Sequence, residues 1–241
     1  MSTAPAGAEA TKRGGAGKGR GGASPPSLWA RPPRFLLGAA APGQLPPDRG
    51  REVAFAGRSN AGKSSALNAL AGVRSLARTS KAPGRTREIN FFAWDAERRL
   101  ADLPGYGYAK VPRETTRRWA ALLERYFQRR SLAGLVLLMD VRHPLTPLDR
   151  QILDVAAHRR LPVLLLLTKA DKLGRGAALE ALRRVRRELP AWEEAAGAPA
   201  PWRAELFSAR TRLGVPEARR AIESLMNQSV RGFCGQKEAP A

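Results

Sequence analysis

Cysteine and histidine are scarce in this chain of 241 residues, which has one cysteine and two histidines. The single Cys234 excludes an internal disulfide framework and suits a reducing cytoplasm. Two histidines and one cysteine far apart in the sequence argue against a zinc site. No apolar run approaches the roughly 18 residues needed to cross a bilayer, and no secretory signal segment is recognisable. A cytoplasmic protein without stable membrane insertion is therefore expected.

Acidic side chains are scarce relative to basic ones. The 42 lysines and arginines outnumber the 21 aspartates and glutamates, which gives a formal net charge of +21. The first 34 residues hold six basic side chains and one acid, so most of the excess lies in the rest of the chain. Such a field favours polyanions, namely RNA, DNA or an anionic membrane surface. A compositional preference for arginine explains the choice of Arg over Lys, but not the excess of base over acid.

One short segment matches the phosphate-binding pattern G-x-x-x-x-G-K-[ST]. An apolar run at 53–56 precedes it and a helix-forming run at 65–71 follows it. Strand, glycine loop and helix together direct backbone N–H groups and a helix N-terminus at phosphate. Lys63 is predicted to reach the β- and γ-phosphates, and the Ser64 hydroxyl to ligate Mg²⁺. The segment consists of Gly57, Arg58, Ser59, Asn60, Ala61, Gly62, Lys63 and Ser64, with Ser65 next.

Strand-like and helix-like segments alternate from about residue 50 onward. The apolar runs 135–139 and 163–167 are typical of strands buried on both faces of a parallel sheet. The pattern predicts an α/β fold of the P-loop NTPase kind: a mostly parallel six-stranded sheet with one antiparallel edge strand and helices on both faces. The expected strands are 52–56, 88–94, 98–102, 134–140, 162–168 and 204–208, and the expected helices are 63–71, 113–129, 147–159, 176–189 and 216–226.

The chain divides into three parts by composition. Residues 1–43 are rich in Gly, Ala, Pro and Arg and predict a disordered basic tail. Residues 44–227 form the predicted nucleotide-binding α/β domain, and 228–241 are expected to be a flexible C-terminal tail. The outward arginines of the helix at 176–189 are either simply solvated or a contact for RNA.

Three further segments follow strand candidates and complete a nucleotide site. In the first, an aspartate can hold Mg²⁺ through water and a glycine N–H can sense a γ-phosphate. In the second, the Asp171 carboxylate can accept the N1–H and N2–H₂ edge of guanine, which adenine lacks, while the Lys169 stem lies along the base. In the third, a backbone N–H can reach guanine O6. These segments are Asp102, Leu103, Pro104 and Gly105; Thr168, Lys169, Ala170 and Asp171; and Phe207, Ser208 and Ala209.

These motifs in this order resemble the EngB-type bacterial GTPases, also called YihA or YsxC. The resemblance spans roughly residues 44–226, and its most specific segments are 83–86 and 102–108. It departs from the family pattern at Ala61, Ala82 and Ala209, of which Ala209 is the least secure assignment. The resemblance implies a GTPase needed for assembly of the large ribosomal subunit and linked in some bacteria to cell division.

The resemblance also implies two switch segments. The first lies around residues 74–90, where Gly84, Arg85 and Thr86 would meet the nucleotide and Thr86 would sense Mg²⁺ and the γ-phosphate. The second runs from Asp102 to about 112, and Gly84 and Gly105 would be the hinges. The expected metal ligands are thus Ser64 and Thr86.

Tyr106 stands directly after D-x-x-G, where many GTPases place a glutamine that orients the attacking water. Slow intrinsic hydrolysis is therefore expected, with a ribosomal activator or K⁺ supplying what is missing. Asn60 resembles the asparagine that coordinates K⁺ in potassium-activated GTPases, although a role in loop geometry alone is an equal alternative. The residues expected to act in catalysis are Lys63, Thr86 and Asn60. Tyr106 and Tyr108 are in addition candidate RNA contacts.

Two function classes remain open. The first is a GTP-hydrolysing switch that binds GTP, GDP and Mg²⁺, acts on the precursor of the large ribosomal subunit (rRNA and ribosomal proteins) and is monomeric off the ribosome. The second is a basic RNA-binding assembly factor in which nucleotide sets shape and hydrolysis is incidental. A membrane-surface role comes third, because no amphipathic apolar helix or lipidation signal accompanies the charge.

Overall fold

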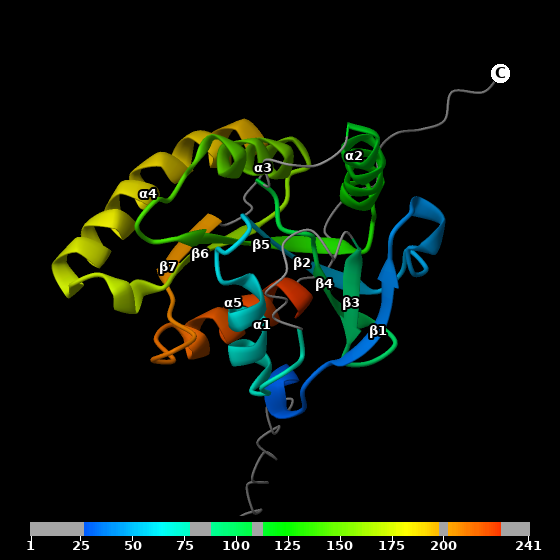
Figure 1. Cartoon of the computed structure of the whole chain (residues 1–241), viewed down its shortest axis with the longest axis horizontal. Helices are drawn as coiled ribbons and strands as arrows, with labels where there is room; N and C mark the ends of the chain where they lie inside the picture. The colour runs from blue at the N-terminus through cyan, green and yellow to red at the C-terminus, as the bar shows by residue number, and fades with distance from the viewer. Residues whose placement is uncertain (1–26, 78–87, 108–112, 198–201, 228–241) are drawn as a thin grey trace, which may run out of the picture.

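The structure is a computed structural model that describes residues 27–77, 88–107, 113–197 and 202–227 (Figure 1). Within these residues one sheet of seven strands has the order β1-β3-β4-β2-β5-β6-β7. Strands β4, β2, β5, β6 and β7 run parallel, and β3 is antiparallel to both of its neighbours. The strands are β1 Arg34–Ala39, β2 Arg51–Gly57, β3 Ile89–Ala93, β4 Arg98–Asp102, β5 Leu132–Asp140, β6 Val163–Thr168 and β7 Trp202–Leu206.

Helices cover both faces of the sheet. Figure 1 shows α2, α3 and α4 on one face and α1 and α5 on the other. The helices are α1 Lys63–Ala71, α2 Arg113–Phe127, α3 Pro147–His158, α4 Arg175–Ala196 and α5 Val215–Asn227, with 3-10 turns at η1 Leu28–Ala30, η2 Pro42–Gln44 and η3 Ala170–Lys172. No helix among the described residues combines the length and apolar character that spanning a membrane requires.

The central strand β5 is apolar on both sides, as the sequence predicts. Leu135 and Leu137 belong to the core under α2, α3 and α4. Val136 and Leu138 belong to the core under α1 and α5. Because successive side chains of a strand point to opposite faces, one continuous apolar run supplies both cores.

The sheet has one strand more than predicted. Strand β1 pairs with β3 and lies inside the 1–43 range that was expected to be a disordered tail. That expectation is wrong for residues 27–43, and the antiparallel strand β3 is interior rather than at the edge. The reason is that β1 buries little: only Ala39 is fully buried and Phe35 is 61% exposed. Its backbone ladder to β3 stabilises it instead, and composition does not reveal a ladder.

Helix α4 is longer than predicted, because it continues through Pro190 to Ala196. Three of its arginines lie close to a carboxylate or a carbonyl group. Arg183 and Arg187 each lie 3.7 Å from the Glu180 carboxylate. Arg186 donates through Nε and Nη2 to the carbonyl of Ala204 on the edge strand β7, at 3.1 and 2.8 Å.

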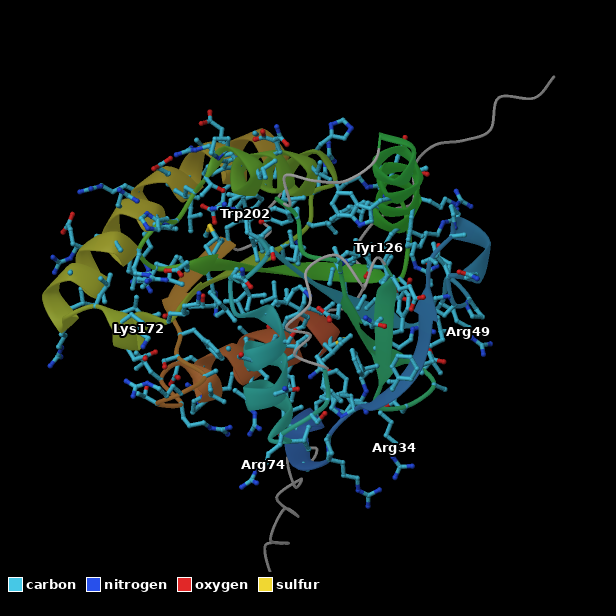
Figure 2. The ribbon with its side chains drawn as sticks, viewed as in Figure 1. Arg34, Arg49, Arg74, Tyr126, Lys172 and Trp202 are labelled. Atoms are coloured by element: carbon cyan, nitrogen blue, oxygen red, sulfur yellow. The ribbon has the colours of Figure 1, made fainter. Side chains whose placement is uncertain are left out.

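A buried ionic cluster lies where strands β2 and β4 begin. The Glu52 carboxylate accepts from Arg129 Nη2 at 2.8 Å and lies 2.9 Å from Arg99 Nη2. Glu52 is fully buried, and both guanidinium groups are nearly so. Arg129 follows α2, so the cluster ties this helix to the end of the sheet that lies away from the phosphate loop. Tyr126 of α2 lies beside the cluster (Figure 2).

We expect Glu52→Ala to lower the free energy of unfolding by about 3–5 kcal/mol, because it leaves two buried cations without their counter-charge. Urea denaturation monitored by circular dichroism measures the change. Glu217→Ala is the matched control, since Glu217 pairs with Arg220 on an exposed turn of α5 and its loss should have little effect. Equal small losses for both variants would contradict a structural role for the cluster.

Candidate functional site

Four loops meet at the carboxyl edge of the sheet. They follow β2, β4, β6 and β7, and they carry the four segments that the sequence singled out. Carboxyl ends of parallel strands lie at one edge of a sheet, and ligands of open α/β folds bind there. The structure therefore brings the predicted residues of these four loops together.

The loop after β2 leads directly into α1. Asn60 and Gly62 adopt left-handed conformations with φ of +64° and +87°. Gly62 is the N-cap of α1 and provides no side chain to cap the first turn. The N–H groups at Lys63, Ser64 and Ser65 are therefore free of a capping side chain, which is the arrangement that receives an anion.

The Lys63 ammonium forms an ion pair with the carboxylate of Asp102, the last residue of β4. Both side chains are largely buried. Burial raises the pKa of Asp102, and the positive charge of Lys63 opposes that rise. The two charges predicted to meet phosphate and Mg²⁺ thus neutralise each other in this structure.

The segment after Asp102 lies against the phosphate loop. Leu103 N donates to Phe55 O and Ser59 N donates to Tyr106 O, both at 2.9 Å. A Cβ added to Gly105 would lie 3.3 Å from the backbone of Ser59, so only glycine allows this close approach without a shift. Tyr106 is 7% exposed, so its proposed contact with RNA is wrong for this conformation.

The end of β6 is fastened to the phosphate loop by two side chains. Thr168 Oγ1 lies 2.6 Å from Ala61 O and 3.0 Å from Met139 O. Lys169 Nζ donates to Asn60 O at 2.7 Å and pairs with the Asp140 carboxylate at 3.0 Å. The base-binding and phosphate-binding loops are therefore one connected unit.

Asp171 receives two hydrogen bonds at its carboxylate. Ser208 Oγ donates to Oδ1 at 2.6 Å, and Arg210 Nε donates to Oδ2 at 2.8 Å. These bonds, that of Ser208 first, lower the pKa of Asp171 from its ordinary value. A lowered pKa keeps the carboxylate ionised near neutral pH, as accepting the guanine edge requires.

A pocket of about 530 Å³ opens between α1 and the loops after β6 and β7. This volume is in the range of small-molecule sites. Its walls include predicted residues (Gly62, Ser65, Thr168, Lys169, Asp171, Phe207 and Ala209) and unpredicted ones (Asn68, Ala69, Gly72, Val73, Arg74, Lys172, Arg210 and Arg212). Figure 2 shows Lys172 near the start of α4 and Arg74 beyond the end of α1.

Asn68 is the most connected residue that the sequence prediction missed. Its Oδ1 accepts from the N–H groups of Leu76 and Ala77 at 2.9 Å, and its Nδ2 donates to Arg74 O and Ala77 O at 3.2 Å. It thereby holds the chain that leaves α1 toward residue 78. The spacing of Ser65, Asn68 and Ala69 on one face of α1 was the available signal.

The structure describes only some of the remaining predicted residues. Gly84, Arg85 and Thr86, and also Tyr108, lie outside the described residues, so their roles stay predictions.

Among the described residues no cluster of His, Cys, Asp and Glu could itself hold a metal. Ser64 and Asp102 nevertheless fit Mg²⁺, because this ion commonly takes few protein oxygens and completes its shell with phosphate and water. None of the described residues hydrogen-bonds the Ser64 hydroxyl.

The sequence is similar to those of known GTP-binding proteins. The profile of the family described as "50S ribosome-binding GTPase" matches residues 52–169. The chain is 48% identical over 190 residues to the "Probable GTP-binding protein EngB" of Coxiella burnetii (strain RSA 331 / Henzerling II), which covers 78% of this chain and 90% of that protein. It is 52% identical over 197 residues to the protein of that name from Stenotrophomonas maltophilia (strain K279a), covering 81% and 96%.

Solved structures share the fold. A crystal structure of a probable GTP-binding protein EngB superposes with a TM-score of 0.56 at 22% identity, covering 73% of this chain and 98% of that one. Aquifex aeolicus Era bound to GDP and AlF₄⁻ superposes with a TM-score of 0.58 at 18% identity, covering 80% and 62%. At these identities the likeness supports the fold alone.

The fold and the four loops define a P-loop GTPase, an enzyme that binds GTP and GDP and hydrolyses GTP. Within this class the chain belongs to the EngB family of GTP-binding proteins.

We expect Asp171→Asn to weaken GDP binding by about 10- to 100-fold, the size of a lost charged hydrogen bond. The same change should improve binding of xanthosine diphosphate, whose C2 carbonyl accepts from the new amide. Competition against a fluorescent nucleotide measures both. Asp154→Asn on an exposed turn of α3 is the control, and unchanged base preference in Asp171→Asn would contradict the assignment.

Proposed function

We propose that this protein is a GTP-driven switch for assembly of the large ribosomal subunit, with a further link to cell division. The observation that carries the proposal is that Lys63, Asp102 and Asp171 all lie at the carboxyl edge of the sheet, where Lys63 pairs with Asp102 and Asp171 lines the pocket. The ribosomal assignment is supported by the description of the matching family and by a net charge of +21, which suits an RNA partner. We further propose that it acts in the cytoplasm and is monomeric off the ribosome.

In this proposal GTP binding exchanges one ion pair for another. Lys63 turns from Asp102 to the β- and γ-phosphates, which leaves the Asp102 carboxylate free. Ser64, and Thr86 from the first switch, would provide oxygens for Mg²⁺, and Asp102 would hold the ion through water. When bound, Mg²⁺ supplies charge neutralisation at the phosphates. The N–H groups of the first turn of α1 then stabilise the charge that develops between the phosphates.

Asn60 is proposed as a ligand for K⁺. Its left-handed φ of +64° is one reason for an asparagine here, because Asn tolerates this region better than most residues. Its side chain is exposed and makes no hydrogen bond within the described residues, so the amide oxygen is available to a cation. The two explanations predict different behaviour for a glycine at this position.

We expect K⁺ to accelerate GTP hydrolysis over Na⁺ in the wild type, and Asn60→Gly to abolish the difference. Glycine keeps the left-handed conformation but removes the amide, so the variant separates loop geometry from cation binding. Steady-state phosphate release in matched KCl and NaCl measures the effect. An Asn60→Gly protein that still responds to K⁺ would restrict Asn60 to loop geometry.

We expect binding to large-subunit precursors that is strong with a non-hydrolysable GTP analogue and weak with GDP or no nucleotide. Sedimentation with ribosomal subunits across a salt series measures it, and affinity should fall steeply with salt because phosphates dominate the contact. Retention on the subunit under the analogue supports a hydrolysing switch. Normal release and complete assembly under the analogue favour the alternative, an RNA-binding factor with incidental hydrolysis. Binding that ignores nucleotide contradicts the switch.

A further inference from the structure

The Tyr106 hydroxyl makes a buried hydrogen bond that the nucleotide site does not use. It donates to Asp149 Oδ1 at 2.6 Å, across from the loop after β4 to the first turn of α3. Asp149 is 1% exposed. Burial and the neighbouring carboxylate both raise the pKa of Tyr106, so its proton stays in place and the bond has one direction.

Asp149 is itself held by its own helix. Its Oδ2 accepts from Thr146 N at 2.9 Å and from Thr146 Oγ1 at 2.7 Å, so it closes the N-terminal cap of α3. The carboxylate therefore has one oxygen for the cap and the other for Tyr106. The acceptor is rigid, because α3 packs on the sheet through buried residues such as Leu153.

The backbone of Tyr106 is fixed on its other side. Its carbonyl accepts from Ser59 N at 2.9 Å, and Arg58 and Tyr106 form an isolated parallel bridge. Gly105 is thus enclosed between the phosphate loop and a residue anchored at α3. Gly107, which follows Tyr106, has φ of +89° and is the first residue after Asp102 with a conformation that favours glycine.

We propose that Tyr106 is a positioning residue for GTP hydrolysis: its bond to Asp149 holds the Gly105 N–H against the phosphate loop. The proposal rests on the proposed switch. It also explains how a tyrosine serves where other GTPases place a glutamine. The side chain is directed at α3, so it orients the backbone rather than the attacking water.

Loss of this role should affect the binding of GTP and not that of GDP. Gly105 can contact a γ-phosphate but has nothing to contact in GDP. If Gly105 loses its support, the affinity for GTP and the rate of hydrolysis should fall while the affinity for GDP is kept. A purely structural role would weaken both nucleotides alike.

The test is Tyr106→Phe, which removes only the hydroxyl. We expect the dissociation constant of a non-hydrolysable GTP analogue to rise by about tenfold and single-turnover hydrolysis to slow by a similar factor, with GDP binding unchanged. Tyr126→Phe is the matched control, since it removes a hydroxyl from another buried tyrosine, beside the Glu52 cluster and away from the phosphate loop. It should leave the ratio of GTP-analogue to GDP affinity unchanged.

A second comparison separates the bond from the cap of α3. Thr146→Val disturbs the other oxygen of Asp149 without touching Tyr106, and it should lower stability but keep the affinity ratio. In an Asp149→Ala background, Tyr106→Phe should cause no further loss of affinity for the GTP analogue.

Equal weakening of the binding of both nucleotides by Tyr106→Phe, or no change in either, overturns the proposal. If the wild type sediments with subunits irrespective of nucleotide, the switch itself fails; if it switches and Tyr106→Phe keeps its affinity ratio, only the positioning role fails.

Discussion

Strand β2 is hydrogen-bonded to β4 on one side and to β5 on the other, with Phe55 opposite Asp102 in one ladder and Val136 in the other. These two registers set where each following loop begins. A slip by one residue between β2 and β4 would turn the Asp102 side chain to the other face of the sheet and away from Lys63. The buried Glu52 cluster, which ties β2 and β4 to Arg129 at the opposite end, opposes such a slip. The geometry of the site therefore depends on pairing several residues away from it.

Three ion pairs join charged side chains of the loops around the site. Lys63 pairs with Asp102, Lys169 with Asp140, and Asp171 with Arg210. A buried charge without a partner is costly, so these pairs keep the site folded without nucleotide. Binding of a guanine nucleotide would then give Lys63 a phosphate in place of Asp102 as its ionic partner. An exchange of this kind costs less to reverse, which suits a protein that must bind and release its ligand repeatedly.

Patterns with a strong local cause were predicted well. The apolar run of β5 and the helix after Gly62 were both located to within two residues, because burial periodicity and the glycine loop act within one segment. Strand β1 was missed because it has little to bury. The predicted helix stopped at residue 189, before Pro190, whereas α4 continues to Ala196. In the site, Asn68 was missed, since its partners lie in a loop whose path the sequence does not determine.

By itself the sequence determined the class of fold, the phosphate loop and the preference for guanine, because each rests on a short run of residues whose chemistry is local. The tertiary structure alone decided what each charge pairs with and which way Tyr106 points. Asp149 lies 43 residues from Tyr106, and the bond between them exists because α3 packs beside the loop after β4. Contacts at such separation arise from the packing of whole elements, and no pattern within either segment encodes them.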